Sequence, residues 1–492
     1  MSGEHKYVLM GWRLKPKLAL AILFILLLTK VVAFVLRGPS PLIWDANYYW
    51  ILGGSVAQGD WLLTGHEVAF RTPGYPWLVG SLQRLTSSPL WSLVCVQAGI
   101  WLATVMLAAS LARQFVDDMR AAAVVLAIAA VMVSSLTYVN AVLTETLFTF
   151  AVLVHLWFVA RFVRQPNVML GALVGATLAA AMLIRPVAML LWVADVGFLL
   201  VSRWAPLTPE KHQHCWRRTL ISVAVAGVVT LGCVTPWLAR NHAMFGKWMM
   251  TEFVGRNIWI VTFQDGSGAG LPMPTSDSAT KLKSVIGQAG WEKLRQADRW
   301  RETWMVSKTL TRSGLDDAQT DQLMKAVAFD AIAQNPTSYA KKTIRRWLNF
   351  WRTRATELPE PLSVLEHSGG GFDGQTNRQE IVKQYFAGER IWGRQVAIID
   401  TALRHRASNS LMATTLVMVL SGLATMLVVL HRPTRPAGVW FALILAYFSA
   451  VTAVLEIPGY RYRMIVEPMM LIVIAMAVVL LIRKWDSRRL AR

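Results

Sequence analysis

Six clusters of ionisable residues interrupt a chain that is otherwise strongly apolar, and their types suit the handling of a phosphate. The clusters contain Asp45, Arg71, Glu145, Arg185, Arg240 and Arg461. Arginine side chains bind phosphate oxygens in pairs and stay charged, and a carboxylate can accept a proton from a hydroxyl group. This combination suits transfer of a sugar from a lipid-linked phosphate, because the phosphate leaves with a negative charge that nearby cations stabilise.

Five of these clusters also have a structural interpretation. Asp45 could cap the helix that follows it, and Arg71, before a Pro-Gly turn, could bind lipid headgroups. Glu145 could pair with an arginine, while Arg185 could extend to the interface at a helix break. Arg461 could be an interfacial anchor. The chemical interpretation therefore depends on whether the fold brings these residues to one place.

The composition is that of a membrane protein. Of the 492 residues, 54% are hydrophobic and 16% are charged, whereas about a quarter are charged in soluble proteins. Membrane topology and anionic lipids account for the net charge of +21, so no nucleic-acid partner is expected. The three cysteines have unrelated spacings and predict neither a disulfide framework nor a zinc site. A water-soluble enzyme, a zinc-finger protein and a disulfide-rich small protein are excluded.

Ten apolar runs are long enough, or nearly so, to cross a bilayer as helices. They cover residues 18–36, 90–111, 121–138, 147–160, 168–184, 187–201, 219–237, 411–430, 439–455 and 464–482. With the N-terminus in the cytoplasm, every cytoplasmic segment is basic, as the positive-inside rule requires. These segments hold Arg13, Lys15 and Lys17, Arg113 and Arg120, Arg161 and Arg164, Arg203, Lys211, Arg217 and Arg218, Arg432 and Arg435, and Arg483, Lys484, Arg488 and Arg489. The sequence therefore predicts a mainly α-helical, polytopic transmembrane bundle with both ends in the cytoplasm.

Two long segments then fall on the outer face. Residues 37–89 form a loop, and residues 240–409 are long and polar enough for a small outer domain, with helical periodicity at 291–304 and 317–334. Residues 336–351 have the aromatic and basic composition of an interfacial helix. We expect three parts, which are a transmembrane module of residues 1–239 with spans one to seven, the outer domain of residues 240–409, and a transmembrane segment of residues 410–492 with spans eight to ten.

In this topology all six clusters lie at the outer membrane–water interface, where ionisable residues are costly and are candidates for function. A single displacement with Asp45 as general base would invert the anomeric centre of the sugar. A divalent metal ion could assist. Its candidate ligands are Asp45, Glu67, His66 and His242, none of which has the spacing of a dedicated site.

The order of these motifs resembles the GT-C superfamily of membrane glycosyltransferases. Within it, the chain is most similar to the group of dolichyl-phosphate-mannose-dependent protein mannosyltransferases, aminoarabinose transferases and galacturonic acid transferases. The similarity spans nearly the whole chain. It rests on Asp45-Ala46 with Tyr48, Arg71-Thr72-Pro73-Gly74-Tyr75-Pro76, Thr144-Glu145, Arg185-Pro186, Pro236-Trp237 with Arg240-Asn241, Asn335-Pro336 with Tyr339, and Arg461-Tyr462 with Glu467-Pro468.

The resemblance implies a GT-C type bundle in which Asp45 is the catalytic base and Glu145, also catalytic, lines the same cavity. It also implies donor-phosphate contacts from Arg71, Arg185, Arg240, Arg461 and Tyr462. Two positions depart from the family. Ala46 stands where protein mannosyltransferases have a second acidic residue, and Thr72 follows Arg71 where aminoarabinose transferases have Lys-Pro-Pro.

The sequence thus predicts an integral membrane glycosyltransferase that uses a polyprenyl-phosphate sugar donor. Its acceptor would be a hydroxyl group of a glycolipid, glycan or protein at the outer, periplasmic face of the cytoplasmic (inner) membrane, among membrane lipids. A transporter or flippase for a lipid-linked sugar is one alternative, and it would need polar residues through the mid-membrane and preferably repeated halves. A polysaccharide polymerase or ligase is the other, and it would use a longer donor on a pyrophosphate carrier.

Overall fold

The computed structural model describes residues 16–42, 45–132, 136, 138–204, 216–264, 270–352, 416–457 and 460–490, and the regular elements in these ranges are helices. Seven helical segments there are long and apolar enough to cross a membrane, and three shorter apolar helices accompany them. The long segments are α1 (Pro16–Leu36), α4 (Pro89–Val116), α6 (Glu145–Arg164), η2 with α8 (Pro186–Leu190 and Leu191–Trp204), α9 (Trp216–Phe245), η5 with α18 (Arg432–Thr434 and Arg435–Leu455) and α20 (Glu467–Leu490). The shorter ones are α5 (Met119–Val131), α7 (Val168–Ile184) and the helix Leu416–Leu430. The predicted polytopic helical bundle is confirmed.

Each of the ten expected runs overlaps one of these helices, but the third is shorter than expected. The apolar pattern continued to residue 138, whereas α5 ends at Val131 and Met132 is extended. Asn140, in the connection that follows, donates from Nδ2 to the carbonyls of Phe34 and Gly38 at 2.7 and 2.6 Å. These two bonds tie the connection to the end of α1.

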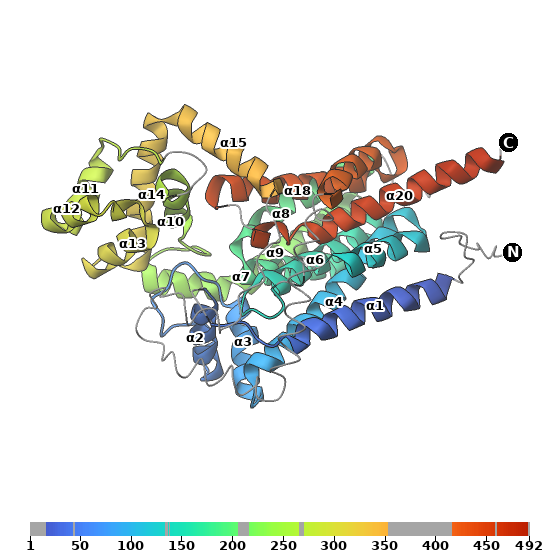
Figure 1. Cartoon of the computed structure of the whole chain (residues 1–492), viewed down its shortest axis with the longest axis horizontal. Coiled ribbons are helices and arrows are strands. Elements are labelled where there is room, and N and C mark those ends of the chain that lie inside the picture. The colour runs from blue at the N-terminus through green and yellow to red at the C-terminus, as the bar shows by residue number, and fades with distance from the viewer. Residues whose placement is uncertain are drawn as a thin grey trace.

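The long helices run roughly parallel, as Figure 1 shows. The start of α1 and the end of α20 lie at one end of the bundle, whereas α2 (Asp45–Ala57), α3 (Gly74–Leu85) and a separate group of helices lie at the other. This placement agrees with the expectation that the loop carrying Asp45 and the second polar segment lie on the same side.

Close contact between α7 and α9 depends on small residues. A side chain at Gly171 would place Cβ 2.3 Å from the Ser222 carbonyl oxygen, and one at Gly175 would place it 2.2 Å from that of Ala226. Both distances are far below van der Waals contact, so the two backbones meet where only glycine fits. Thr230 of α9 adds a hydrogen bond of 3.0 Å to the Gly175 carbonyl.

The second group of helices forms a small domain with its own apolar core. Its members are α10 (Val254–Trp259), α11 (Asp277–Ile286), α12 (Gln288–Gln296), α13 (Thr303–Arg312) and α14 (Asp317–Gln334). Trp259, Leu310 and Met324 are fully buried in that core. The expected helix at 317–334 is confirmed, and a capping box from Asp316 to Gln319 begins it.

The stretch with helical periodicity at 291–304 is helical but interrupted, because the end of α12, a 3-10 turn and the start of α13 share it. The chain leaves α12 at Gln296, passes through Asp298 with a φ of 51°, and enters α13 at Thr303 after the 3-10 turn Arg299–Arg301. A left-handed residue ends a helix, which the apolar spacing alone does not reveal.

The amphipathic stretch at 336–351 is one helix, α15 (Pro336–Arg352), which packs against α18. Arg346 is fully buried and donates from Nε to the Ala453 carbonyl at 2.6 Å, and Tyr339 donates to the Val454 carbonyl at 2.9 Å. Trp347 and Leu348 remain exposed. The helix therefore joins the small domain to the bundle while it keeps one apolar face outward, as an interfacial helix would.

The division at residues 239 and 240 falls inside a helix, because α9 continues to Phe245. The division at residues 409 and 410 lies outside the described residues.

Candidate active site

Two carboxylates and three arginines from distant parts of the sequence form one connected cluster. Arg71 Nη2 donates to Asp45 Oδ1 at 2.5 Å, and Arg461 Nη2 donates to Asp45 Oδ2 at 3.1 Å. Glu145 Oε1 forms ion pairs with Arg461 Nε at 3.0 Å and with Arg185 Nη1 at 3.2 Å. Five of the six predicted clusters therefore meet in space, and Arg461 links the two carboxylates.

Two further residues of the last cluster border the same group. Tyr462 donates from its hydroxyl to Glu456 Oε2 at 2.9 Å. The guanidinium groups of Arg461 and Arg185 lie 5.2 and 5.5 Å from the centre of the Tyr462 ring, within cation–π range. Burial raises the pKa of Glu456, although the Tyr462 hydroxyl and Arg461 act to lower it.

The electrostatics keep Asp45 ionised. Burial alone would raise the pKa of its carboxyl group, but Arg71 and Arg461 together outweigh burial, with a further contribution from Arg185. The pKa of Asp45 therefore lies below its ordinary value of 3.8. Asp45 is a carboxylate at neutral pH and can accept a proton.

The arginines have hydrogen-bonding capacity to spare. A guanidinium group carries five N–H donors. Within the described part of the chain, the side-chain ion pairs and hydrogen bonds of Arg185 use only Nη1, and those of Arg71 use only Nη2. The remaining N–H groups can bind an anion in the cavity.

Local packing explains why Arg71 and Arg185 lie close together. Thr72 donates from its hydroxyl to the Ile184 carbonyl at 3.1 Å. Gly74 begins α3 against the end of α7, where a Cβ would lie 2.7 Å from the Leu183 carbonyl oxygen. The turn after Arg71 is therefore attached to the residues just before Arg185. Arg185 itself is extended, with φ −147° and ψ 123°, at the break between α7 and η2.

Glu145 lies behind the arginines and not on the cavity surface. It is fully buried at the start of α6, while Arg185 and Arg461 lie between it and the cavity that they line. The connection before it is held by Gln97, which donates from Nε2 to the Val139 and Ala141 carbonyls, both at 2.8 Å. This position suits a residue that orients the arginines.

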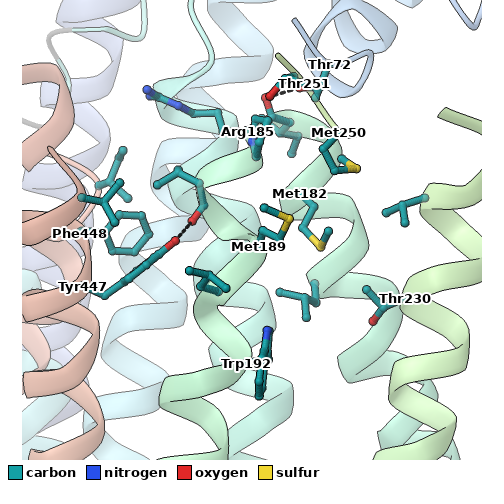
Figure 2. Close-up of a pocket in the computed structure, with 18 of the residues that line it drawn as sticks. Thr72, Met182, Arg185, Met189, Trp192, Thr230, Met250, Thr251, Tyr447 and Phe448 are labelled. Atoms are coloured by element: carbon teal, nitrogen blue, oxygen red, sulfur yellow. Dashed lines mark hydrogen bonds between the residues drawn. The ribbon is translucent and has the colours of Figure 1, made fainter. Parts of the chain in front are cut away.

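A cavity of about 1190 Å³ opens beside the cluster and continues between the helices of the bundle. Its polar end is lined by Asp45, Arg71, Arg185, Glu456, Arg461 and Tyr462, and its remaining wall is mostly apolar. Figure 2 shows Thr72 and Arg185 towards one end, Met182 and Met189 further along, and Trp192 and Thr230 deeper. At a rise of about 1.5 Å per residue, the lining from Ile184 back to Gly171 on α7 extends for about 20 Å. The cavity thus combines a charged end with a long apolar channel.

One charged group lies deep in this channel. Asp195 of α8 lines the cavity, and its two oxygens contact His155 Nε2 at 2.9 Å and Trp440 Nε1 at 3.0 Å. Sequence reasoning missed both Asp195 and His155, although an ionisable residue within an apolar run is itself a signal.

Arg240 lies apart from the cluster. It is buried near the end of α9 and donates to the carbonyl oxygens of Leu63, His66 and Val68 in the outer loop. It does not line the described cavity. The expected phosphate contact of Arg240 stays a prediction, and its geometry suits a clamp that holds the loop carrying Arg71.

The four residues named as metal ligands do not gather into a site for a divalent cation. Both oxygens of Asp45 face guanidinium groups, His66 Nε2 lies 2.5 Å from the Ser55 hydroxyl, and the ring of His242 stacks on Trp248 at 4.7 Å. Across the described ranges, no group of three or more histidine, cysteine, aspartate or glutamate side chains could hold a metal ion. No step of the reaction proposed below passes through a metal.

In a comparison with known proteins, one segment of the chain matches a family model. Residues 71–238, which are 168 of the 492, match the model of the dolichyl-phosphate-mannose-protein mannosyltransferase family. The expected resemblance to GT-C glycosyltransferases is confirmed over this segment. None of the curated proteins matches the chain significantly.

Among solved structures, the chain is similar to the oligosaccharyltransferase AglB from Archaeoglobus fulgidus, in complex with an inhibitory peptide and a dolichol-phosphate, with 12% identity and a TM-score of 0.46. That match covers 96% of this chain and 51% of the other, so the chain spans about half the length of that protein. A second similarity is to ArnT from Cupriavidus metallidurans, with 15% identity, a TM-score of 0.37, and coverage of 92% of this chain and 77% of the other. ArnT bound to undecaprenyl phosphate gives 14% identity, a TM-score of 0.34 and the same coverage.

Proposed function

We propose that this chain transfers a sugar from a polyprenyl-phosphate donor to an acceptor hydroxyl group at the outer face of the cytoplasmic membrane. The observation that carries the proposal is the junction of the arginine–carboxylate cluster with the apolar channel. A polyprenyl phosphate is an anion joined to a long hydrocarbon chain, and the cavity has a matching charged end and apolar extension.

In this proposal the phosphate binds to Arg71, Arg185 and Arg461. The spare N–H groups of these arginines bind its oxygens, and their charge stabilises the phosphate as it leaves. The hydrocarbon tail lies along α7 and α9. Arg185 begins the break between α7 and α8, so its side chain lies where the channel reaches the charged end.

Asp45 acts as the general base. Its carboxylate takes the proton of the acceptor hydroxyl group, whose oxygen attacks the anomeric carbon of the sugar. The bond from that carbon to the phosphate oxygen breaks, and the electron pair leaves with the polyprenyl phosphate. A single displacement of this kind inverts the anomeric centre. Glu145 is a positioning residue, because it contacts Arg185 and Arg461 and is buried away from the cavity.

Donor binding also prepares Asp45 for this role. In the structure both its oxygens are bound by arginines. A phosphate that binds Arg71 or Arg461 competes with Asp45 for their N–H groups and adds a negative charge nearby, which raises the pKa of the carboxyl group. Asp45 then becomes a stronger base when the donor is present.

Mass spectrometry of the cell envelope tests the function. Glycolipids, glycans and glycoproteins are compared between cells with the chain, cells without it, and cells that carry Asp45→Asn. We expect one sugar to disappear from one class of molecule in the last two. If no sugar-bearing product differs between cells with and without the chain, glycosyl transfer is contradicted.

One observation favours the transporter alternative. Asp195 places a carboxylate on the wall of the channel within a membrane-spanning segment, as a mid-membrane transport site would require. Its partners His155 and Trp440 also fit a purely structural role between α6, α8 and α18. Movement of a fluorescent polyprenyl-phosphate sugar across vesicles containing the purified protein, without any transferred sugar, would support transport.

A further inference from the structure

Three aromatic residues form a continuous surface at the polar end of the cavity, and we call Phe70, Phe253 and Trp304 the aromatic shelf. The ring centres of Phe70 and Phe253 are 5.2 Å apart with an interplanar angle of 25°. Trp304 lies 5.7 Å from Phe70 and 6.1 Å from Phe253. All three line the cavity. The small outer domain contributes Trp304 through α13, and the loop before Arg71 contributes Phe70.

The shelf is next to the charged cluster. The Arg71 guanidinium lies 4.9 Å from the centre of the Phe70 ring and 5.8 Å from that of Phe253. Arg71 contacts Asp45 directly. A group that rests on the shelf is therefore one side chain away from the proposed base.

Trp304 is more exposed than a core residue of this size. Its relative exposure is 43%, although it contacts two other aromatic rings. A large aromatic face that is left open in a cavity is typical of a ligand-binding surface, whereas an aromatic ring that stabilises the core is covered on both faces. The open face carries the negative side of the ring quadrupole, which attracts weakly positive C–H groups.

Asn257 supplies a polar group beside the shelf. It lies on α10, four residues after Phe253, and lines the cavity. Its Oδ1 is buried and has no hydrogen-bond partner among the residues that the structure describes. A buried amide oxygen without a partner costs free energy, and a hydroxyl group of a ligand would remove that cost.

An aromatic face with an adjacent amide matches the two surfaces of a pyranose ring, which has a face of C–H groups and an edge of hydroxyl groups. The hydrocarbon tail of the donor is a poorer match. It has no donor for Asn257, and the apolar channel along α7 and α9 already offers it a longer site.

We propose that the aromatic shelf and Asn257 bind a pyranose ring, stacked on Trp304 and hydrogen-bonded to the Asn257 amide. The proposal rests on the proposed function, since it identifies a carbohydrate as the molecule held beside Arg71. The ring comes either from the sugar of the donor or from a glycan that carries the acceptor hydroxyl group.

Saturation-transfer difference NMR on the full chain in lipid nanodiscs tests this subsite. The probes are the methyl pyranosides of glucose, mannose, galactose and N-acetylglucosamine, each added with undecaprenyl phosphate. We expect saturation of the ring C–H protons of at least one probe. Replacement of the indole in Trp304→Ala should reduce this signal about fivefold, the effect of one aromatic contact. Trp304→Phe should retain part of it.

Trp61→Ala is the matched control, because Trp61 is 47% exposed on the outer loop and does not line the described cavity. Its signal should equal that of the unmodified chain, and Asn257→Ala should weaken the signal without abolishing it. The proposal is overturned if none of the four probes is saturated by the unmodified chain. It is also overturned if Trp304→Ala and Trp304→Phe both give the full signal.

A competition experiment identifies the source of the ring. If undecaprenyl-phosphoryl glucose abolishes the signal of the free probe while undecaprenyl phosphate does not, the ring belongs to the donor. If the free probe still binds beside the sugar-bearing donor, the ring belongs to the acceptor. Native mass spectrometry of undecaprenyl phosphate on the same samples tests the proposed function separately. If the unmodified chain binds no undecaprenyl phosphate but still gives the pyranoside signal, the proposed donor site is contradicted and the proposed pyranose site is not.

Discussion

Replacement of Asp45 by asparagine tests whether Asp45 acts as a general base or only as a counter-ion to the arginines. Asparagine keeps the size and one hydrogen-bond acceptor but has no charge and cannot take the proton. A positioned general base contributes about 10²- to 10⁴-fold to rate. We therefore expect Asp45→Asn to reduce sugar transfer by at least about 10²-fold.

The same substitution should strengthen donor binding. In the structure Asp45 accepts hydrogen bonds from Arg71 at 2.5 Å and from Arg461 at 3.1 Å. A phosphate on these arginines would lie roughly 6 Å from the carboxylate. At that distance the repulsion is about 0.7 kcal/mol in water and about 3 kcal/mol at an effective dielectric constant of 20. Its removal should therefore lower the Kd for undecaprenyl phosphate by roughly 3- to 100-fold.

Donor binding and sugar transfer are measured separately for each variant. Native mass spectrometry gives the Kd for undecaprenyl phosphate, and envelope mass spectrometry of complemented cells gives transfer. Asp277→Asn is the control, because Asp277 is an exposed carboxylate at the start of α11. Wild-type transfer by Asp45→Asn would refute the base assignment. Weaker lipid binding together with a lower Tm would show that Asp45 mainly holds the arginines in place.

Three further predictions concern pH, the phosphate site and the helix packing. Because Arg71 and Arg461 hold the pKa of Asp45 below 3.8 in the donor-free protein, kcat/KM for transfer, which reports the free enzyme, should be constant from pH 7.5 to pH 5 and fall only below about pH 4; a loss of kcat/KM centred near pH 6 would contradict the assignment. Arg185→Lys should raise the Kd for undecaprenyl phosphate about 5- to 10-fold, because lysine cannot form paired N–H contacts, and an unchanged Kd in native mass spectrometry would argue against a phosphate contact. Gly175→Val should destabilise the bundle by about 1–3 kcal/mol, since its Cβ would meet the Ala226 carbonyl oxygen; thermal unfolding should show no such loss for Gly232→Val, where nothing lies within 4 Å.

The location of the cluster could be predicted from the sequence because membrane topology is a strong constraint. Alternating spans bring Asp45, Arg71, Arg185 and Arg461 to the same end of the bundle, whatever the details of packing. The break at Arg185-Pro186 was also predictable, since proline at that position ends the helix before it.

The orientation of individual side chains could not be predicted in this way. Sharing a membrane face does not decide whether a side chain points to the cavity or to a loop, and Arg240 contacts the backbone of the outer loop. Glu145 also lies at this membrane face, but its side chain is buried and does not line the cavity. The aromatic shelf combines Phe70 with Trp304, which are 234 positions apart in the numbering, and no local pattern links them.

The connection between Ala69 and the small outer domain has a mechanical consequence. Asp317 of α14 accepts a hydrogen bond from the Ala69 amide at 2.7 Å, while the Glu252 amide donates to the Ala69 carbonyl at 2.9 Å. Arg256, fully buried, holds Asp317 by an ion pair. Both the amide and the carbonyl of Ala69, two residues before Arg71, are therefore hydrogen-bonded. A rotation of the outer domain would therefore move the backbone at Arg71 with it. A molecule that binds to the outer domain and rotates it would change the position of the Arg71 guanidinium, and with it the affinity of the arginine–carboxylate cluster for phosphate.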